Sequence, residues 1–375
     1  MPASAVKSQL FIGLMSGTSL DGVDGVLADF SSPQPRVLAH RTLPFAPALK
    51  QELLALNAPS DNELHRAAMA ANGLARVYNQ TVHTLLADTQ TAASDVCAIG
   101  AHGQTVRHQP GAFDGTGYTL QLNNPALLAE LTGIDVVADF RSRDVAAGGQ
   151  GAPLVPVFHQ GIFGQASCTV GVLNIGGIAN LSVLHANGDV SGFDCGAGNA
   201  LLDHWCQAHT GYEFDSNGAW GASGTVLEPL LQAMLAEPYL HQAPPKSTGR
   251  DLFHPTWLAQ QLSGYADAHA ADVQATLTEF TACACVNDVL RYAADASELI
   301  VCGGGALNGL LMQRLQAGLR KVRVLTSAER GMPPLQVEAA AFAWLARQTV
   351  LGLPGNLPKV TGAQGARILG GIFKA

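Results

Sequence analysis

Short apolar runs that end in glycine turns alternate along the chain with stretches of helical periodicity. The run LFIGLM at 10–15 predicts a buried strand, and a polar turn separates it from a second apolar run between Val23 and Phe30. The stretch 170–184 repeats this strand–turn–strand pattern around two adjacent glycines. Further strands are predicted where apolar runs end at glycine or aspartate, within 96–107, 133–140 and 299–305.

Helices are predicted where apolar residues recur every three to four positions. The longest such segment is 62–90, and the others are 200–210, 225–236, 270–293, 306–319 and 334–351. Glycines and prolines interrupt the pattern between 141 and 156, which is the predicted domain boundary. Because strand–glycine turn–strand opens both halves and helix-rich sequence follows each, the pattern indicates two related α/β halves.

Composition narrows the class of protein. The 375 residues include 41 glycines, 47% are hydrophobic and only 13% are charged, which excludes a disordered chain. The glycines do not recur at every third position, which excludes a collagen-like chain. Charged residues interrupt every long apolar run, so we expect no membrane span. The net charge of −8 without a basic cluster disfavours a nucleic-acid partner. Seven scattered cysteines without a CxxC pair, and an N-terminal apolar run too short for a signal peptide, favour a cytoplasmic protein.

Two glycine turns are candidate phosphate-binding segments. The first, Gly17–Asp24, comprises Gly17, Thr18, Ser19, Leu20, Asp21, Gly22, Val23 and Asp24. Its backbone N–H groups and hydroxyls suit a phosphate, but the same residues suit a polar hairpin turn. The second comprises Asn174, Gly176 and Gly177, and on its own a plain hairpin turn explains it equally well. Together, two such turns would hold a triphosphate from both sides.

The segment GFDCGAGN at 192–199 places Asp194 at a strand end before a glycine turn and a helix. This carboxylate is a candidate general base, and an Asx-type turn that caps the helix is the alternative. A third glycine turn, with Gly303, Gly304 and Gly305, follows a strand. It fails the dinucleotide fingerprint because Asn308 stands where glycine or alanine is required, yet it could still meet an adenosine.

Charged residues in glycine-rich surroundings are few. Arg143 could stabilise a transferring phosphoryl group or bind a substrate carboxylate, or it could form a surface ion pair with Asp144. Glu338 could contact a substrate or simply carry charge at a helix N-terminus. No GxSxG, HExxH or Walker A motif is present, so no motif supports a hydrolase, a metalloprotease or a P-loop nucleotide-binding protein.

A set of long motifs makes the chain resemble the anhydro-N-acetylmuramic acid kinase family. They occur in consistent order over essentially the whole chain: Gly13–Asp24, AHGQTVRH at 101–108, the stretch 124–156, LNIGGIANL at 173–181, GFDCGAGNALLD at 192–203, KSTGRDLF at 246–253 and CGGGALN at 302–308. Ala197 departs from the proline common in the family, but the neighbouring aspartate and glycines are kept.

The resemblance implies a two-lobed α/β fold of the actin/hexokinase/Hsp70 superfamily, a duplicated ribonuclease-H-like fold with an ATP cleft between the lobes. The implied lobes are 1–141 with 340–375, and 142–339. The implied activity is a kinase of peptidoglycan recycling and amino-sugar catabolism. With ATP and Mg²⁺, it opens 1,6-anhydro-N-acetylmuramic acid with water and phosphorylates O6, giving N-acetylmuramic acid 6-phosphate. The resemblance also implies a cytoplasmic homodimer.

Roles transfer to matching positions. The resemblance implies that Asp194 activates the water, that Arg143 and Glu338 lie near the sugar and catalytic centre, and that Asp21 contacts Mg²⁺. The two turns would hold phosphates, and 302–308 would meet the adenosine. Two other readings stay open: a nucleotide-gated scaffold of the same superfamily, in which hydrolysis only moves the lobes, and a kinase for an ordinary sugar hydroxyl.

Overall fold

The computed structural model describes residues 9–17, 20–32, 34–249 and 252–375. The chain divides into unit 1, Met1–Ile162 with Gln336–Ala375, and unit 2, Phe163–Leu335. The sequence analysis placed the first boundary at 141, but the structure places it at 162. The reason is Asp144, whose carboxylate accepts hydrogen bonds from Asn356 Nδ2 (2.6 Å) and Thr361 Oγ1 (2.8 Å) and so fixes the segment after 141 within unit 1.

Unit 1 is built on a mixed sheet with the strand order β13-β7-β4-β1-β2-β3. β1 pairs antiparallel with β2 and parallel with β4; β7 is parallel to β4, and β3 is antiparallel to β2. The strands are β1 (Leu10–Met15), β2 (Gly22–Asp29), β3 (Arg36–Pro44), β4 (Val96–Ala101), β7 (Val136–Ala138) and β13 (Gly371–Phe373).

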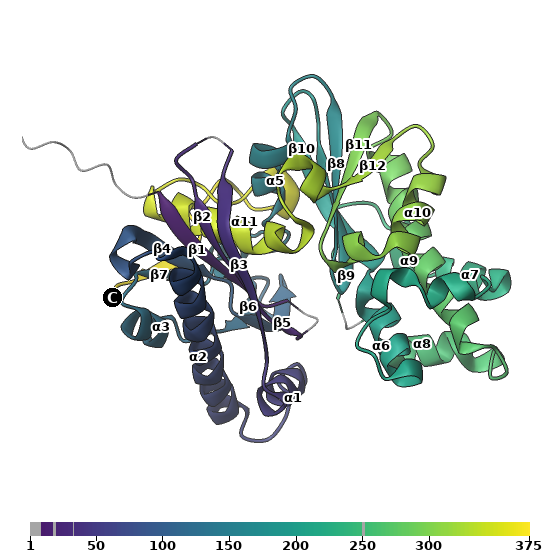
Figure 1. The fold of residues 1–375 in the computed structure, drawn as a ribbon, viewed down its shortest axis with the longest axis horizontal. Coiled ribbons are helices and arrows are strands. Elements are labelled where there is room, and N and C mark those ends of the chain that lie inside the picture. The colour runs from purple at the N-terminus through teal and green to yellow at the C-terminus, as the bar shows by residue number, and fades with distance from the viewer. Residues whose placement is uncertain (1–8, 18–19, 33, 250–251) are drawn as a thin grey trace, which may run out of the picture. The chain divides into compact units, whose positions relative to one another are not determined.

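Helices α2 (Glu63–Thr89) and α11 (Val337–Val350) cover opposite faces of this sheet (Figure 1). Ile12 and Leu14 of β1 join the core beneath α2, whereas Phe11 joins the core beneath α11. Gly13 allows α11 to approach β1 closely, because a Cβ there would collide with the carbonyl oxygen of Ala339. The predicted helices 62–90 and 334–351 are thus confirmed, with boundaries shifted by up to three residues.

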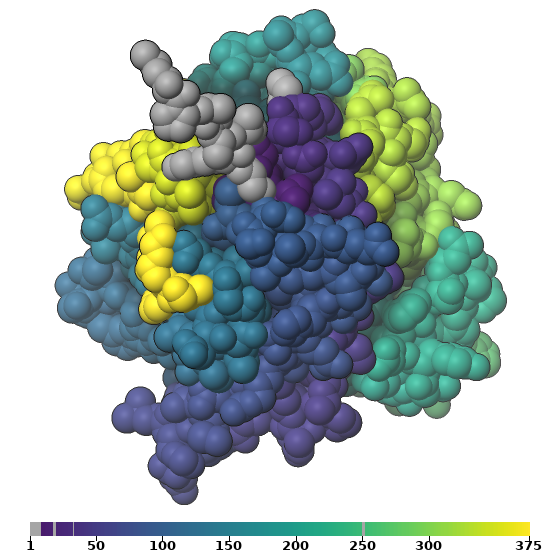
Figure 2. Space-filling model, turned by 60° about the vertical axis from the view of Figure 1, so that its left-hand side comes forward, coloured from purple at the N-terminus to yellow at the C-terminus, as the bar shows by residue number. Residues whose placement is uncertain are grey.

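The remaining elements of unit 1 surround the sheet. They are α1 (Pro47–Ala55), α3 (Pro125–Thr132), α4 (Ser142–Ala146), α5 (Pro156–Phe163), α12 (Pro358–Thr361) and the hairpin of β5 (Gln104–Pro110) and β6 (Gly117–Leu122). The C-terminal strand β13 adds to the sheet edge beside β7, and Lys374 Nζ lies 2.6 Å from Asp135 Oδ2. Figure 2 shows these last residues, in yellow, lying on the surface of unit 1.

Unit 2 carries a second mixed sheet, in the order β10-β9-β8-β11-β12. Its strands are β8 (Thr169–Ile175), β9 (Ile178–Leu184), β10 (Val190–Ala197), β11 (Ala296–Cys302) and β12 (Arg323–Thr326). The long helix α9 (Ala270–Tyr292) and α10 (Gly309–Gly318) pack on the sheet around Leu173, Val289 and Leu311. A second core joins α9 to α6 (Asn199–Thr210), α7 (Glu228–Leu235) and α8 (Pro255–Gln261).

Short 3₁₀ segments complete the described secondary structure. They are Ala93–Asp95, Ser216–Gly218, Gly221–Ser223, Pro238–His241, Leu262–Gly264, Gly304–Leu307, Ser327–Arg330 and Pro334–Gln336. Among the residues that the structure describes, no helix combines the length and the apolar character needed to cross a bilayer.

The two units repeat one topology. In unit 1 the order is β3-β2-β1-β4-β7 before β13 is added, and in unit 2 it is β10-β9-β8-β11-β12. In both, an antiparallel three-strand meander is followed by parallel strands added on the other side of its first strand. This repeat confirms the duplication inferred from the two strand–turn–strand patterns and the predicted duplicated, two-lobed α/β fold.

Candidate active site

Glycine-rich turns that are far apart in sequence meet at one end of the unit 2 sheet. The backbone N–H of Asn199, at the start of α6, donates to Gly176 O in the β8–β9 turn (2.7 Å). A Cβ at Gly303 would lie only 2.5 Å from Asn174 Oδ1, and one at Gly304 would lie 3.3 Å from Asn199 Nδ2. The structure therefore brings together the predicted second phosphate turn and the predicted adenosine segment. What binds there stays a prediction.

The other glycines of these turns have the same packing function. Gly198 N and Ala200 N both donate to Gly177 O, at 3.0 and 3.2 Å, so the β8–β9 turn is closed against the N-terminus of α6. A Cβ at Gly305 would lie 2.5 Å from Ile175 Cβ. Any larger residue would separate the two turns, which explains why glycines concentrate here.

Asp194 lies on β10, four residues before the turn into α6, and is half-buried. The pairing of β10 with β9 shifts register between Asp194 and Gly196, and such a bulge re-aims the side chains beside it. One carboxylate oxygen, Oδ2, accepts a hydrogen bond from the backbone N–H of Thr248 (3.0 Å). Tyr239 Oη donates to the Asp194 carbonyl (2.8 Å), and Asp194 N donates to Lys246 O (3.2 Å).

This geometry bears on the two readings of Asp194. The Thr248 N–H that donates to its carboxylate lies in the 246–248 segment, outside the first turn of α6. The general base and the helix cap both remain predictions for Asp194. The sequence analysis assigned no role at the site to Tyr239, Lys246 or Thr248. The last two belong to the KSTGRDLF motif at 246–253, but nothing in its sequence indicates that it lies beside Asp194.

In unit 1, the turn after β1 is the first predicted phosphate segment, of which Thr18 and Ser19 lie outside the described residues. Leu20 is buried with a left-handed backbone (φ 59°), and its N–H donates to Gly17 O (3.2 Å). Gln104 Nε2 also donates to Gly17 O (3.1 Å). Asp21 is exposed, and its Oδ1 lies 3.6 Å from Lys50 Nζ.

The later residues of this segment are already part of strand β2. Val23 is fully buried, and a Cβ at Gly22 would collide with the Leu43 carbonyl of β3. Asp24 Oδ1 accepts a hydrogen bond from Thr42 Oγ1 (2.5 Å) and lies 3.3 Å from His40 Nε2. The side chains of Leu20 and Val23 are therefore committed to the core, so only their backbone groups are available to a ligand.

Polar side chains gather where the parallel strands of unit 1 end. Arg141, just after β7, donates through Nε (3.1 Å) and Nη2 (2.8 Å) to Nε2 of buried His102, just after β4. Burial, together with the Arg141 charge, lowers the pKa of His102 well below its usual value, so the imidazole is neutral. Ser16, just after β1, contacts the hydroxyl of buried Tyr78 (3.1 Å).

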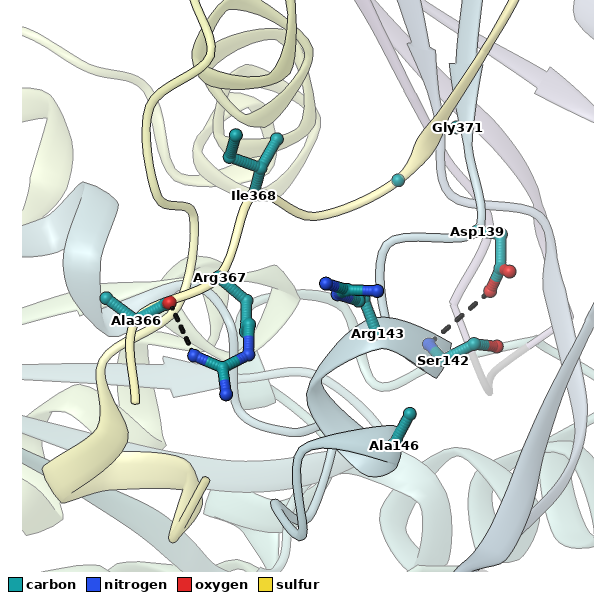
Figure 3. Close-up of a pocket in the computed structure, with 9 residues that line it drawn as sticks. Asp139, Ser142, Arg143, Ala146, Ala366, Arg367, Ile368 and Gly371 are labelled. Carbon is teal, nitrogen blue, oxygen red and sulfur yellow. Dashed lines mark hydrogen bonds between the residues drawn. The ribbon is translucent and has the colours of Figure 1, made fainter. Parts of the chain in front are cut away.

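Arg143 lies on α4 and lines a pocket of about 730 Å³ in unit 1. The pocket also contains Arg367, from the C-terminal segment, and the two side chains lie on facing sides of it (Figure 3). Within the described residues, no ion pair or hydrogen bond joins Arg143 to Asp144, whose carboxylate is taken by Gly151 N (2.8 Å), Asn356 and Thr361. The ion-pair alternative for Arg143 is therefore wrong.

Glu338 is half-buried in the first turn of α11. This is the position that the helix-charge alternative requires, and it leaves a substrate contact as a prediction. Within the described ranges, no three His, Cys, Asp or Glu side chains gather to hold a metal ion.

The sequence profile described as anhydro-N-acetylmuramic acid kinase matches residues 9–375. The chain belongs to the anhydro-N-acetylmuramic acid kinase family. The kinase of that name from Variovorax paradoxus (strain S110) is 64% identical over 375 residues, covering 99% of this chain and all of that protein. Those from Albidiferax ferrireducens and Cupriavidus metallidurans are 61% and 59% identical, covering 98% and 100% of this chain and all of each relative.

Membership confirms the resemblance inferred from the motifs. Because the match to the anhydro-N-acetylmuramic acid kinase family begins at residue 9 and runs to the last residue, it spans both units. The glycine turns, Asp194 and the Arg143 pocket all lie inside the matched region.

Proposed function

We propose that this chain is an ATP-dependent kinase that opens 1,6-anhydro-N-acetylmuramic acid with water and phosphorylates O6, giving N-acetylmuramic acid 6-phosphate and ADP. Family membership supports the reaction class. The observation that carries the mechanism is Asp194: a half-buried carboxylate with one oxygen fixed by the Thr248 N–H, on a strand that leads into the glycine turns.

In the proposed reaction, Asp194 takes a proton from the attacking water, whose oxygen bonds to the anomeric carbon. The bond between that carbon and O6 breaks, and O6 takes the γ-phosphoryl group as the bond to the β-phosphate oxygen breaks. A carboxylate suits this step because it can accept the proton of the water as a general base, without forming a covalent bond to the sugar. Phosphoryl transfer itself requires mostly positioning and charge stabilisation, which rigid glycine turns provide.

ATP is the proposed phosphoryl donor. The backbone N–H groups around Gly17 in unit 1 and around Gly176 and Gly177 in unit 2 are the proposed phosphate contacts, because glycine lets the backbone approach an anion closely. The segment with Gly303, Gly304 and Gly305 is the proposed adenosine contact, since it packs directly against the second of these turns.

Magnesium fits this arrangement as an ion carried on the nucleotide. Mg²⁺ is usually held by one or two carboxylates together with substrate phosphates and waters, so a cage of protein ligands is not required. Asp21 is an exposed carboxylate in the first phosphate segment and is the proposed protein contact, with Lys50 as a competing cation at 3.6 Å. When bound, the ion would neutralise charge on the transferring phosphoryl group.

The muramic acid substrate carries a carboxylate, and unit 1 offers two guanidinium groups in one pocket. We assign Arg143 and Arg367 as the contacts for this carboxylate, because guanidinium groups bind carboxylates with paired hydrogen bonds. Glu338 is a proposed contact to the sugar. We expect the enzyme to act in the cytoplasm, within peptidoglycan recycling, as a homodimer.

Isotope labelling tests the proposed reaction. In ¹⁸O-water, the label should appear at the anomeric hydroxyl of the phosphosugar and not in the phosphate. Equal activity on N-acetylmuramic acid would instead favour a kinase for an ordinary sugar hydroxyl. ATP turnover that ignores the anhydrosugar and yields no phosphosugar would favour the nucleotide-gated scaffold.

Substitution tests the role of Asp194. Asp194→Asn should bind both substrates but lose at least about 100-fold in kcat, the usual contribution of a general base. Asp267→Asn is the matched control, because Asp267 is exposed in unit 2. Turnover near the wild-type rate in Asp194→Asn would reject the assignment.

A further inference from the structure

A buried ion pair lies behind Asp194 in unit 2. Lys246 Nζ is 3.1 Å from Asp288 Oδ2 and 3.4 Å from Oδ1, and the two side chains are 1% and 5% exposed. The ammonium group also lies over the rings of Phe193 and Tyr239, 5.5 and 5.2 Å from their centroids. Every face of the lysine head group is thus occupied by protein.

Stabilisation of the fold does not by itself explain this buried ion pair. Removing two charges from water costs several kcal/mol per ion, and hydrophobic pairs of similar volume often stabilise a protein as well or better. Burial raises the pKa of Asp288 even though Lys246 opposes the shift, so desolvation is the larger effect here. A pair retained at this cost has another physical use, and its contacts indicate which one.

The contacts of Lys246 lead directly to Asp194. The Lys246 carbonyl accepts the backbone N–H of Asp194 (3.2 Å), and two residues later the Thr248 N–H donates to Asp194 Oδ2 (3.0 Å). Tyr239, whose ring contacts the lysine head group, donates its hydroxyl to the Asp194 carbonyl (2.8 Å). The backbone of Asp194 is therefore held by Lys246 and Tyr239, and one carboxylate oxygen is held by Thr248 of the same segment as Lys246.

The segment 246–249 has no helix or strand assignment of its own, so no regular hydrogen-bond ladder fixes it. β10 is the edge strand of the unit 2 sheet, and the segment lies along its open side. Asp288, in contrast, belongs to the 23-residue helix α9, which is packed into both cores of the unit. The ion pair is thus a bond between an irregular segment and a rigid helix.

We propose that the Lys246–Asp288 ion pair positions Asp194 for the attacking water, by fixing the 246–248 segment so that the Thr248 N–H holds one oxygen of the carboxylate. Lys246 and Asp288 are positioning residues, because their side chains are buried and act through Asp194. The inference rests on the proposed function of Asp194 as the general base. The charged and titratable groups that act on Asp288 besides Lys246 are Cys195 and Arg291.

The main test removes both charges together, so that no unpaired ion is left buried. We expect the Lys246→Met/Asp288→Leu double variant to melt at or above the wild-type temperature and to keep its KM values for ATP and the anhydrosugar within about threefold. Its kcat should fall on the order of tenfold to a hundredfold, the loss typical of a misplaced catalytic group. The acidic limb of its kcat/KM–pH profile should move to higher pH, because a carboxylate that loses an N–H donor holds its proton more tightly.

Asp288→Asn is the second variant: the amide oxygen still accepts from Lys246, but the buried ammonium loses its counter-charge, so the folded fraction is measured together with kcat. It should lower kcat at least threefold and shift the acidic limb in the same direction. Lys246→Arg keeps the positive charge, so it should retain most of the wild-type kcat. Arg314→Met removes the Arg314–Glu279 pair (3.2 Å) that joins α10 to the same helix α9, and it should change neither kcat nor the pH profile.

The outcomes separate this inference from the proposed function. If Asp194→Asn keeps its turnover, the base assignment is wrong and the positioning role fails with it. If Asp194→Asn is inactive but the double variant and Asp288→Asn both keep the wild-type kcat and pH profile, the ion pair is only structural and the inference is overturned. A proportionate loss of activity and of folded protein, without a shift of the acidic limb, would overturn it as well.

Discussion

A buried histidine should make unit 1 sensitive to mild acid. His159 lies on α5 and is fully buried, next in sequence to Phe158, whose ring contacts Trp344 of α11. Burial lowers the pKa of His159 from 6.5 to about 3, because the charged imidazole would lose its hydration. The folded protein therefore holds this side chain neutral at any pH near neutrality.

The sign and size of the effect follow from linkage. The pKa is depressed in the folded state, so below about pH 6.5 the unfolded chain binds a proton that the folded chain refuses, and stability falls as the pH falls. The loss is about 1 kcal/mol at pH 6 and about 2 kcal/mol at pH 5. It approaches its limit of about 5 kcal/mol only below pH 3, from 1.36 kcal/mol for each pH unit between the two pKa values.

Urea unfolding at pH 7.5, 6 and 5 measures this contribution. His159→Gln should lower stability at pH 7.5 by disturbing the core, but the difference from the wild type should narrow by about 2 kcal/mol on going to pH 5. His83→Gln is the control, because His83 is exposed on α2 and its loss removes one histidine without a burial effect. Parallel pH curves for the wild type and His159→Gln would refute the reasoning.

Two further substitutions test the packing that supports the site. Gly13→Ala should lower the free energy of unfolding in urea by about 3 kcal/mol, because the new Cβ collides with the Ala339 carbonyl and displaces α11. Gly161→Ala is the control, because its Cβ meets open space in α5 and should be neutral or slightly stabilising. Equal stability of the two variants would contradict this prediction. Asp144→Asn should lower the free energy of unfolding by about 2–3 kcal/mol, since the new NH₂ group would face the N–H and O–H donors that now bond to the carboxylate, including Gly151 N. An unchanged melting temperature would contradict this prediction.

The sequence predicted best the long helices, whose spacing of apolar residues can be read within one continuous segment. α2 was expected at 62–90 and is found at Glu63–Thr89, and α9 was expected at 270–293 and is found at Ala270–Tyr292. In both, apolar residues recur with a period that only a helix satisfies. The strand–turn–strand repeats also identified the starts of both sheets, because central strands are continuous apolar runs.

Edge elements and long-range contacts were outside the reach of the same reasoning. β3 is an edge strand with no fully buried residue, so its sequence RVLAHRTLP lacks both a continuous apolar run and a strict alternation. The boundary at 162 depends on a carboxylate, Asp144, that meets partners more than 200 residues away. Arg367 joins Arg143 only through the return of the chain to unit 1, for which the local sequence has no signal.

The abundance of glycine and the scarcity of charge have one physical explanation in this fold. Glycines bring backbone segments into contact, as Gly13 does beneath α11 and Gly303 does beside Asn174, and side chains are thereby excluded from the proposed phosphate-binding turns. A turn without side chains can present N–H groups to an anion but cannot orient a carboxylate. The few charged groups must therefore be fixed by other means. In unit 2 the 246–248 segment holds Asp194, and a buried ion pair holds that segment to α9. Substitution of Lys246 or Asp288 should therefore alter turnover while leaving the glycine turns, and with them the proposed nucleotide binding, unchanged.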